Sequence, residues 1–121
     1  MALKLVGRVI SGKGLGIYFV SLEEYRTFFK RILDREIFCG TLNIELNRGT
    51  WRDLPLKIYM PEGPHAPILF ARGKIFSEDI IVLRPVKSTH PDNVIEIVAG
   101  VNLRKKYQLN DGDCIVIEIV D

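Results

Sequence analysis

Short apolar runs separated by turn-forming residues make up most of the chain. Many of these runs are rich in β-branched residues or alternate apolar with polar positions, which is typical of strands. Gly, Pro and Asn/Asp residues lie between them. In chain order the runs read LKLVGRVISG, IYFV, TLNIEL, LKIYM, PILFARGKIF, DIIVLRPV, NVIEIVA and DCIVIEIV. The pattern predicts a mainly β fold with about seven or eight short strands.

One segment, SLEEYRTFFKRILD, has helical periodicity instead. Its apolar residues share one stripe, which comprises Leu22, Tyr25, Phe28, Phe29, Ile32 and Leu33. Ser21 and Glu24 have the spacing of a capping box, so we expect a helix over about 21–34. A second, short helix is expected near 101–107, followed by a turn at 110–113. Many short strands with one clear helix favour a small closed β-barrel on which that helix packs.

Composition indicates an ordinary globular protein. The 121 residues contain no repeat, linker or low-complexity segment, so 1–121 is expected to be a single domain. The net charge of +2 is too small to indicate binding to nucleic acid or to an anionic membrane. The N-terminal stretch MALKLVGRVISG has too short an apolar run for a signal peptide or a membrane span, and we therefore expect a cytoplasmic protein.

The two cysteines, Cys39 and Cys114, are far apart and have no metal-ligand spacing. Without a signal peptide, a disulfide between them is not expected. Cys114 lies within CIVIEIV and is interpreted as a small buried hydrophobic residue. The segment PEGPHAP, residues 61–67, is interpreted as an exposed loop.

The stretch ISGKGLGIYF places glycines at positions 12, 14 and 16. It is neither a Walker A loop nor a dinucleotide-binding fingerprint, because neither spacing is present. Glycine allows positive φ and close approach to the backbone, so the stretch is either a plain turn or a loop whose N–H groups hold phosphate. Lys13 would favour an anion, but the residues alone leave both interpretations open.

The stretch CGTLNIEL places Thr41, Asn43 and Glu45 on one face of a strand, with Leu42, Ile44 and Leu46 on the other. A hydroxyl and an amide oxygen two residues apart suit a Mg²⁺ ion that also holds nucleotide phosphates and water. The alternative is an exposed polar face of an antiparallel strand.

The stretch KSTHPDNVIEIVA offers short polar donors at Ser88 and Thr89, with His90 before a proline, where it is interpreted as a loop residue. Glu96 lies within an apolar run and faces either solvent by alternation or a pocket, where burial would raise its pKa. Further on, Arg104, Lys105 and Lys106 form a basic cluster that is either a solvated helix face or a phosphate contact. From residue chemistry alone, the sequence indicates a domain that could bind an anion and Mg²⁺, and no more specific function.

Taken in order, four stretches resemble the archaeal CTP-dependent riboflavin kinase family. They are SGKGLGIYFVSLEEYRTFFKRIL, GTLNIEL, KSTHPDNVIEIVAGVNLR and LNDGDCIVIEI. The resemblance runs from about residue 6 to 119 and is weakest between 47 and 77. It implies a small six-stranded cradle-loop β-barrel with one packed helix. It also implies transfer of the terminal phosphoryl group of CTP to the 5′-hydroxyl of riboflavin, giving FMN and CDP with Mg²⁺ assistance.

The resemblance also assigns roles to particular residues. It implies that the nucleotide contacts Gly12, Lys13, Gly14, Leu15, Gly16, Ile17, Tyr18, Val101, Asn102, Leu103 and Arg104. It implies that Thr41 and Asn43 bind Mg²⁺, and that a hydroxyl residue together with Glu96 binds the flavin. The hydroxyl position falls on Ser88 or, with a slipped register, on Thr89, and the family commonly has Thr where Ser88 stands. Our own hypothesis adds that Glu96 orients the attacking hydroxyl and accepts its proton.

Two other function classes fit parts of the sequence. One is a barrel that binds flavin or nucleotide without turnover, although passive storage would not need a Mg²⁺ site. The other is a DNA-binding regulator of the swapped-hairpin type, suggested by LNDGDCIVIEI and opposed by the low net charge. We expect a monomer whose partners are riboflavin/FMN and CTP/CDP, with no nucleic acid and no membrane.

Overall fold

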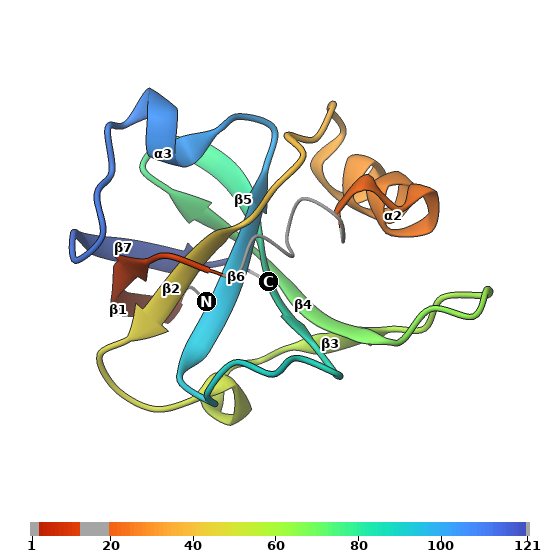
Figure 1. The fold of residues 1–121 in the computed structure, drawn as a ribbon, viewed down its shortest axis with the longest axis horizontal. Coiled ribbons are helices and arrows are strands. Elements are labelled where there is room, and N and C mark those ends of the chain that lie inside the picture. Colours follow the sequence, from red (N-terminus) through yellow and green to blue (C-terminus); the bar gives the residue numbers. More distant parts are fainter. Residues whose placement is uncertain (1–2, 13–19, 121) are drawn as a thin grey trace.

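The structure, a computed structural model, describes residues 3–12 and 20–120. Its strands are β1 (Leu3–Ile10), β2 (Leu42–Leu46), β3 (Lys57–Tyr59), β4 (Ile68–Ile75), β5 (Glu78–Pro85), β6 (Val94–Ala99) and β7 (Cys114–Ile119). All strand pairs are antiparallel, in the order β3-β4-β5-β6-β2-β1-β7. A further pairing of β4 with β7 closes six of these strands into a barrel, and β3 extends β4 outside it (Figure 1). The prediction of a mainly β, six-stranded barrel is confirmed.

The barrel closes at a short seam that depends on one glycine. Only Gly73 and Lys74 of β4 are in register with β7, opposite Ile119 and Glu118. A Cβ atom at Gly73 would lie 2.4 Å from the backbone oxygen of Glu118, closer than real contacts allow. Glycine at this position therefore lets the two strands meet closely enough to pair.

Apolar side chains from all six barrel strands fill the interior. Along β7 the alternation points Ile115, Ile117 and Ile119 inward, and each is at most 2% exposed. Cys114 has the opposite parity and is exposed, so its interpretation as a buried residue is wrong. Cys39 is also exposed, and both cysteines are free thiols.

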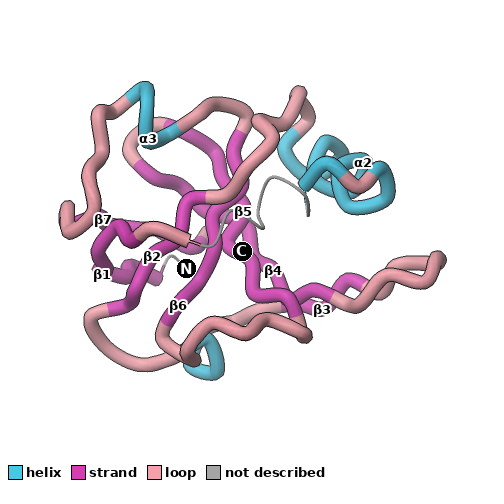
Figure 2. Tube along the Cα trace, viewed as in Figure 1, coloured by secondary structure: helices cyan, strands magenta, loops and turns pink. Residues whose placement is uncertain are grey.

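Helix α2 (Glu23–Leu33) covers the outer face of the barrel (Figures 1 and 2). Its buried residues are Tyr25, Phe28, Phe29 and Leu33, as the apolar stripe predicts. They pack on Ile81 and Leu83 of β5, whose neighbours Ile80 and Val82 point into the barrel. Strand β5 is therefore apolar on both faces because one face lies under a helix.

The predicted capping box of this helix is wrong. The residue at the cap position is Leu22, which makes no side-chain cap. The carboxylate of Glu24 instead accepts hydrogen bonds from the backbone N–H groups of Glu62 (2.6 Å) and Gly63 (3.3 Å). Glu24 therefore makes a tertiary contact with residues 62 and 63 in place of the predicted local contact at the start of the helix.

Two further local predictions are confirmed. Helix α3 (Leu103–Lys106) is capped by Asn102, whose side chain accepts from the N–H of Lys105 at 3.1 Å. The turn at 110–113 is closed by a hydrogen bond from Asp113 N–H to the Asn110 oxygen at 3.0 Å.

A 3₁₀ turn, η1 (Trp51–Asp53), links β2 to β3. Among the described residues no helix has the length and apolar character needed to cross a membrane.

Candidate functional site

A cavity of about 810 Å³ lies between the barrel and helix α2, and among the described residues seven parts of the chain line it. These are the end of β1, the start of α2, the segment before β2 and β2 itself, the loop before β4, the β5–β6 connection, β6, and the segment leading into α3. Its size is within the range of small-molecule sites. Most of the candidate residues line it, namely Gly12, Thr41, Asn43, Ser88, Thr89, Glu96, Val101, Asn102, Leu103 and Arg104. The other predicted nucleotide contacts lie outside the described residues, namely Lys13, Gly14, Leu15, Gly16, Ile17 and Tyr18.

The polar centre of the cavity is built by two neighbouring strands. Asn43 of β2 and Glu96 of β6 face each other in the β-sheet register, although they are far apart in sequence. The Thr41 hydroxyl donates to Glu96 Oε1 at 3.0 Å. Leu42 and Ile44 point into the barrel core, so Thr41 and Asn43 occupy the outer face that borders the cavity. The polar face is therefore a cavity wall at Thr41 and Asn43, whereas Glu45, further along the same face, pairs with Arg8 outside the cavity.

Asn43 and Glu96 are each 9% exposed, which is unusual for side chains of their polarity. Burial raises the pKa of the Glu96 carboxyl, and the Thr41 hydrogen bond and the nearby His90 and Arg84 oppose that shift. Asn43 Oδ1 has no hydrogen-bond partner among the described residues. A buried carbonyl oxygen without a partner carries a desolvation cost that a bound cation or donor would remove.

The end of β1 and the residues after it lie against Asn43, since Ile10 pairs with Asn43 in the sheet. A Cβ atom at Gly12 would lie 2.1 Å from Asn43 Nδ2, so only glycine allows the present position of the Asn43 side chain. Gly12 therefore connects the start of the glycine stretch physically to the polar centre.

These oxygens fit a Mg²⁺ ion of the kind that keeps water and phosphate in its coordination shell. The hydroxyl of Thr41 and the unpartnered Oδ1 of Asn43 are hard oxygen donors, which Mg²⁺ prefers. In the described part of the chain, no group of three or more His, Cys, Asp or Glu residues could hold a metal. A site that completes its ligands from substrate phosphates does not need such a group.

Arg104, which also lines the cavity, holds the end of β1. Its guanidinium donates to the backbone oxygens of Ile10 (3.3 Å) and Leu109 (3.4 Å) and forms an ion pair with Asp111 at 3.0 Å. The Ser11 hydroxyl donates to the same Asp111, and this bond and Arg104 lower the pKa of that carboxyl. The end of β1 is thereby tied to the turn after α3.

The basic cluster that contains Arg104 does not act as one patch. Lys106 turns away to Glu78, which its Nζ approaches at 2.6 Å, and Lys105 is exposed. Of the three cations, Arg104 alone lines the cavity.

The loop 61–67 differs from its interpretation as an exposed loop. Residues 62–64 are exposed, but His65, Ala66 and Pro67 are half-buried and line the cavity. The hydroxyl of Tyr25 donates to the Ala66 oxygen at 2.5 Å, and its ring lies 5.4 Å from that of His65. Sequence reasoning missed this wall, because no local pattern shows that the loop folds back onto α2.

Comparison with known proteins gives a consistent result. The family model CTP-dep_RFKase, described as domain of unknown function DUF120, matches residues 9–119. A riboflavin kinase from Pyrobaculum aerophilum is 35% identical over 98% of this chain and 61% of its own length. One from Staphylothermus marinus is 34% identical over 100% of this chain and 95% of its own. One from Methanococcus aeolicus is 35% identical over 96% and 98%, respectively. The chain spans about three fifths of the length of the Pyrobaculum relatives.

Proposed function

This chain belongs to the CTP-dependent riboflavin kinase family, and we propose that it phosphorylates riboflavin at the 5′-hydroxyl. CTP would donate the phosphoryl group, with Mg²⁺ bound, and the products would be FMN and CDP. The observation that carries the proposal is the meeting of Thr41, Asn43 and Glu96 in one cavity beside the end of β1. A hydroxyl acceptor and a nucleotide need a shared space of this kind.

Phosphoryl transfer depends mainly on positioning and on neutralising charge. Thr41 and Asn43 would hold Mg²⁺, which supplies positive charge to the phosphate oxygens when it is bound. Gly12 and residues 13–18 would contact the nucleotide through their backbone, together with 101–104. Ser88 is the first candidate for the flavin hydroxyl contact: it is half-buried and lines the cavity, and its oxygen accepts from His90 N–H at 3.2 Å, so its own proton is free to donate. Thr89 remains the alternative.

Glu96 would receive the proton of the attacking hydroxyl. A new bond forms between the ribityl oxygen and the terminal phosphorus, and the bond from that phosphorus to the bridging oxygen breaks. The hydroxyl proton passes to Glu96 Oε. Because burial raises the pKa of this carboxyl, it is a stronger base than an exposed glutamate.

Chromatography for FMN after incubation with riboflavin, CTP and Mg²⁺ tests the activity directly. Replacing CTP by ATP in a parallel reaction tests the donor. FMN formed from CTP supports the kinase, whereas riboflavin binding without FMN would indicate a binding protein. A dimeric elution volume with salt-sensitive binding to duplex DNA would favour the regulator instead, since we propose a monomer that binds no nucleic acid.

The variant Glu96→Gln tests the base. We expect a fall in kcat of about 10²-fold or more, with riboflavin binding retained. Glu45→Gln is the matched control, because Glu45 lies on the same face of β2 but pairs with Arg8 at 2.6 Å and does not line the cavity. If Glu96→Gln left both kcat and riboflavin binding unchanged, Glu96 would not be the base.

A further inference from the structure

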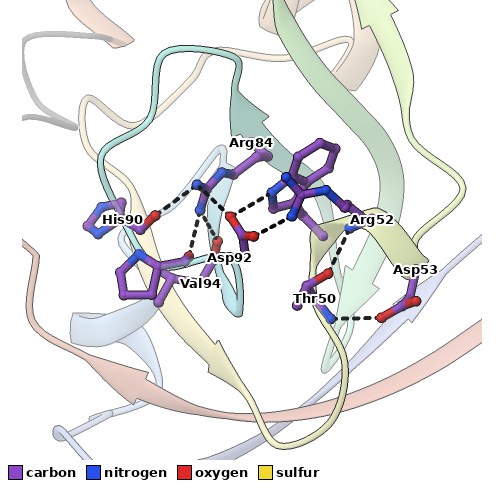
Figure 3. Close-up of polar contacts among 9 residues, drawn as sticks. Thr50, Arg52, Asp53, Arg84, His90, Asp92 and Val94 are labelled. Carbon is purple, nitrogen blue, oxygen red and sulfur yellow. Dashed lines mark hydrogen bonds and ion pairs between the residues drawn. The ribbon is translucent and has the colours of Figure 1, made fainter.

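Arg84 is a buried cation near the end of β5 whose side-chain hydrogen bonds go to the connection to β6 and to the first residue of β6. Its side chain is 8% exposed. Nη2 donates to the backbone oxygen of His90 at 2.8 Å, and Nη1 donates to those of Pro91 (2.8 Å) and Val94 (2.9 Å) (Figure 3). The guanidinium thus gathers three carbonyl groups from a stretch of five residues. Arg84 does not line the cavity itself.

The position of Asp92 completes this arrangement. Its Oδ1 lies 3.8 Å from Arg84 Nη2. Its carboxylate also accepts hydrogen bonds from the Arg52 guanidinium and from the indole N–H of Trp51. Trp51 and Arg52 belong to η1, which a capping box between Thr50 and Asp53 stabilises. Figure 3 shows the resulting chain of contacts from η1 through Asp92 to Arg84. The far end of the β5–β6 connection is therefore fixed from two elements.

The near end of the same connection is fixed by the backbone. Val86 N–H donates to the Pro67 oxygen at 3.1 Å, and Ser88 N–H donates to the Pro85 oxygen at 3.0 Å. Ser88 and Thr89 lie between these bonds and the carbonyl of His90 that Arg84 holds. Their placement at the cavity wall is thus set by anchors on both sides.

A buried cation is a costly way to stabilise a fold. Burial lowers the pKa of Arg84, and an ion pair with a half-exposed partner such as Asp92 recovers little of the desolvation cost. An arginine fork does, however, fix several acceptors in one plane with high geometric specificity. We therefore interpret Arg84 as a residue that fixes the geometry of the connection.

We propose that Arg84 is a positioning residue for the acceptor substrate: it holds residues 86–93 so that Ser88 and Thr89 present their hydroxyls to riboflavin. This inference rests on the proposed function. Arg84 acts through the segment, so its loss should affect riboflavin much more than CTP, whose proposed contacts lie on other elements.

Glu78 provides a matched control. It is a second buried charge on β5, 8% exposed, at the other end of the strand. Its carboxylate accepts from Lys106 (2.6 Å) and from the Tyr107 hydroxyl (2.5 Å), and it touches no residue of 86–93. Glu78→Gln thus weakens a buried charged contact of the same strand without disturbing the connection.

The test compares Arg84→Lys with Glu78→Gln and wild type in steady-state kinetics for both substrates. Lysine keeps the charge but cannot bond to three carbonyls from a planar fork. We expect the KM for riboflavin to rise about 10-fold to 100-fold in Arg84→Lys, with the KM for CTP within about twofold of wild type. Glu78→Gln should leave the KM for riboflavin unchanged. Equal increases in both KM values, or the same riboflavin effect in Glu78→Gln, would overturn the proposal.

Amide hydrogen exchange provides a readout that does not depend on turnover. Arg84→Lys should speed exchange at residues 86–93 more than in β6, measured without substrates. Unchanged exchange there would show that Arg84 does not position the segment, even if the chain is a riboflavin kinase. Wild-type protein that makes no FMN would refute the proposed function instead, and with it the flavin role given to this segment, whatever the exchange data show.

Discussion

Replacing Gly12 by alanine is expected to impair the proposed Mg²⁺ site while leaving the fold intact. The added methyl carbon would lie 2.1 Å from Asn43 Nδ2 and 3.0 Å from its Cγ. Ordinary contacts begin near 3.4 Å, so one of the two residues must move by roughly 1 Å. The backbone before Gly12 is held by pairing of Ile10 with Asn43 and by the Arg104 bond to the Ile10 oxygen. The Asn43 side chain is therefore the part that moves.

The cost to folding should be small and the cost to metal binding large. The φ angle of Gly12 lies outside the left-handed region, so alanine is compatible with the backbone and stabilises slightly through the unfolded chain, by about 0.4–1 kcal/mol. This gain offsets much of the repacking around Asn43, so we expect the free energy of unfolding to change by less than about 1 kcal/mol. A ligand displaced by about 1 Å loses much of its coordination geometry, and we expect the Mg²⁺ affinity to fall about 10-fold to 100-fold.

The assay is a Mg²⁺ titration of FMN formation at saturating CTP and riboflavin, with urea denaturation to measure stability. Because Gly12 also starts the proposed nucleotide loop, a double-mutant cycle with Asn43→Ala isolates the contact. With the Asn43 amide removed, Gly12→Ala should have little further effect on the Mg²⁺ midpoint. An undiminished effect in that background, or an unchanged midpoint in the single variant, would refute the reasoning.

Three further predictions concern the same cavity. Without ligands, Glu96→Gln should be more stable than wild type at pH 7, because burial raises the pKa of Glu96 and its ionisation therefore opposes folding. Urea denaturation should show this difference shrinking as the pH falls below the ordinary pKa of glutamate, where the carboxyl becomes protonated in both the folded and the unfolded state; a difference that grows with acidity would contradict the sign. Tyr25→Phe removes the bond to the Ala66 oxygen and should lower the free energy of unfolding by about 1 kcal/mol, measured by the same method, and no change would mean that this contact contributes nothing. Riboflavin should slow alkylation of Cys39, which lines the cavity, but not of Cys114 on the outside of β7, as peptide mass spectrometry would show; equal rates with and without riboflavin would place the ligand elsewhere.

Local patterns predicted those parts of the fold that local physics determines. The apolar stripe of α2 and the alternation of β2 appear in the structure as expected, because burial of one face decides both. The same alternation along β7 places Cys114 on the outer face, and the residue was misassigned because its apolar surroundings were given more weight than its parity. The capping box failed for a different reason, since Glu24 has a tertiary partner that no local pattern shows.

In the candidate site, too, local pattern identifies the residues, whereas tertiary structure determines how they meet. Thr41, Asn43 and Glu96 could be named from the sequence, but their meeting depends on the register of β2 with β6, which joins residues more than fifty positions apart. The sequence left open whether Glu96 faces solvent or a pocket, and the tertiary structure decides that question by placing Glu96 in the cavity wall beside Thr41 and Asn43. Arg84 was not recognised at all, although a charge within the apolar run DIIVLRPV is the same kind of signal that drew attention to Glu96.

Closure of the barrel by β7 also determines when the protein can fold during synthesis. Strand β7 pairs with β1, so Leu3 meets Ile119, and the same strand seals the edge of β4. Contacts of such long sequence separation form late. Until β7 has emerged from the ribosome, β1 and β4 each present an unpaired edge, and the barrel interior lacks the side chains of Ile115, Ile117 and Ile119. The nascent chain therefore passes through a stage, with β1 to β6 already made and β7 still missing, that is open to aggregation.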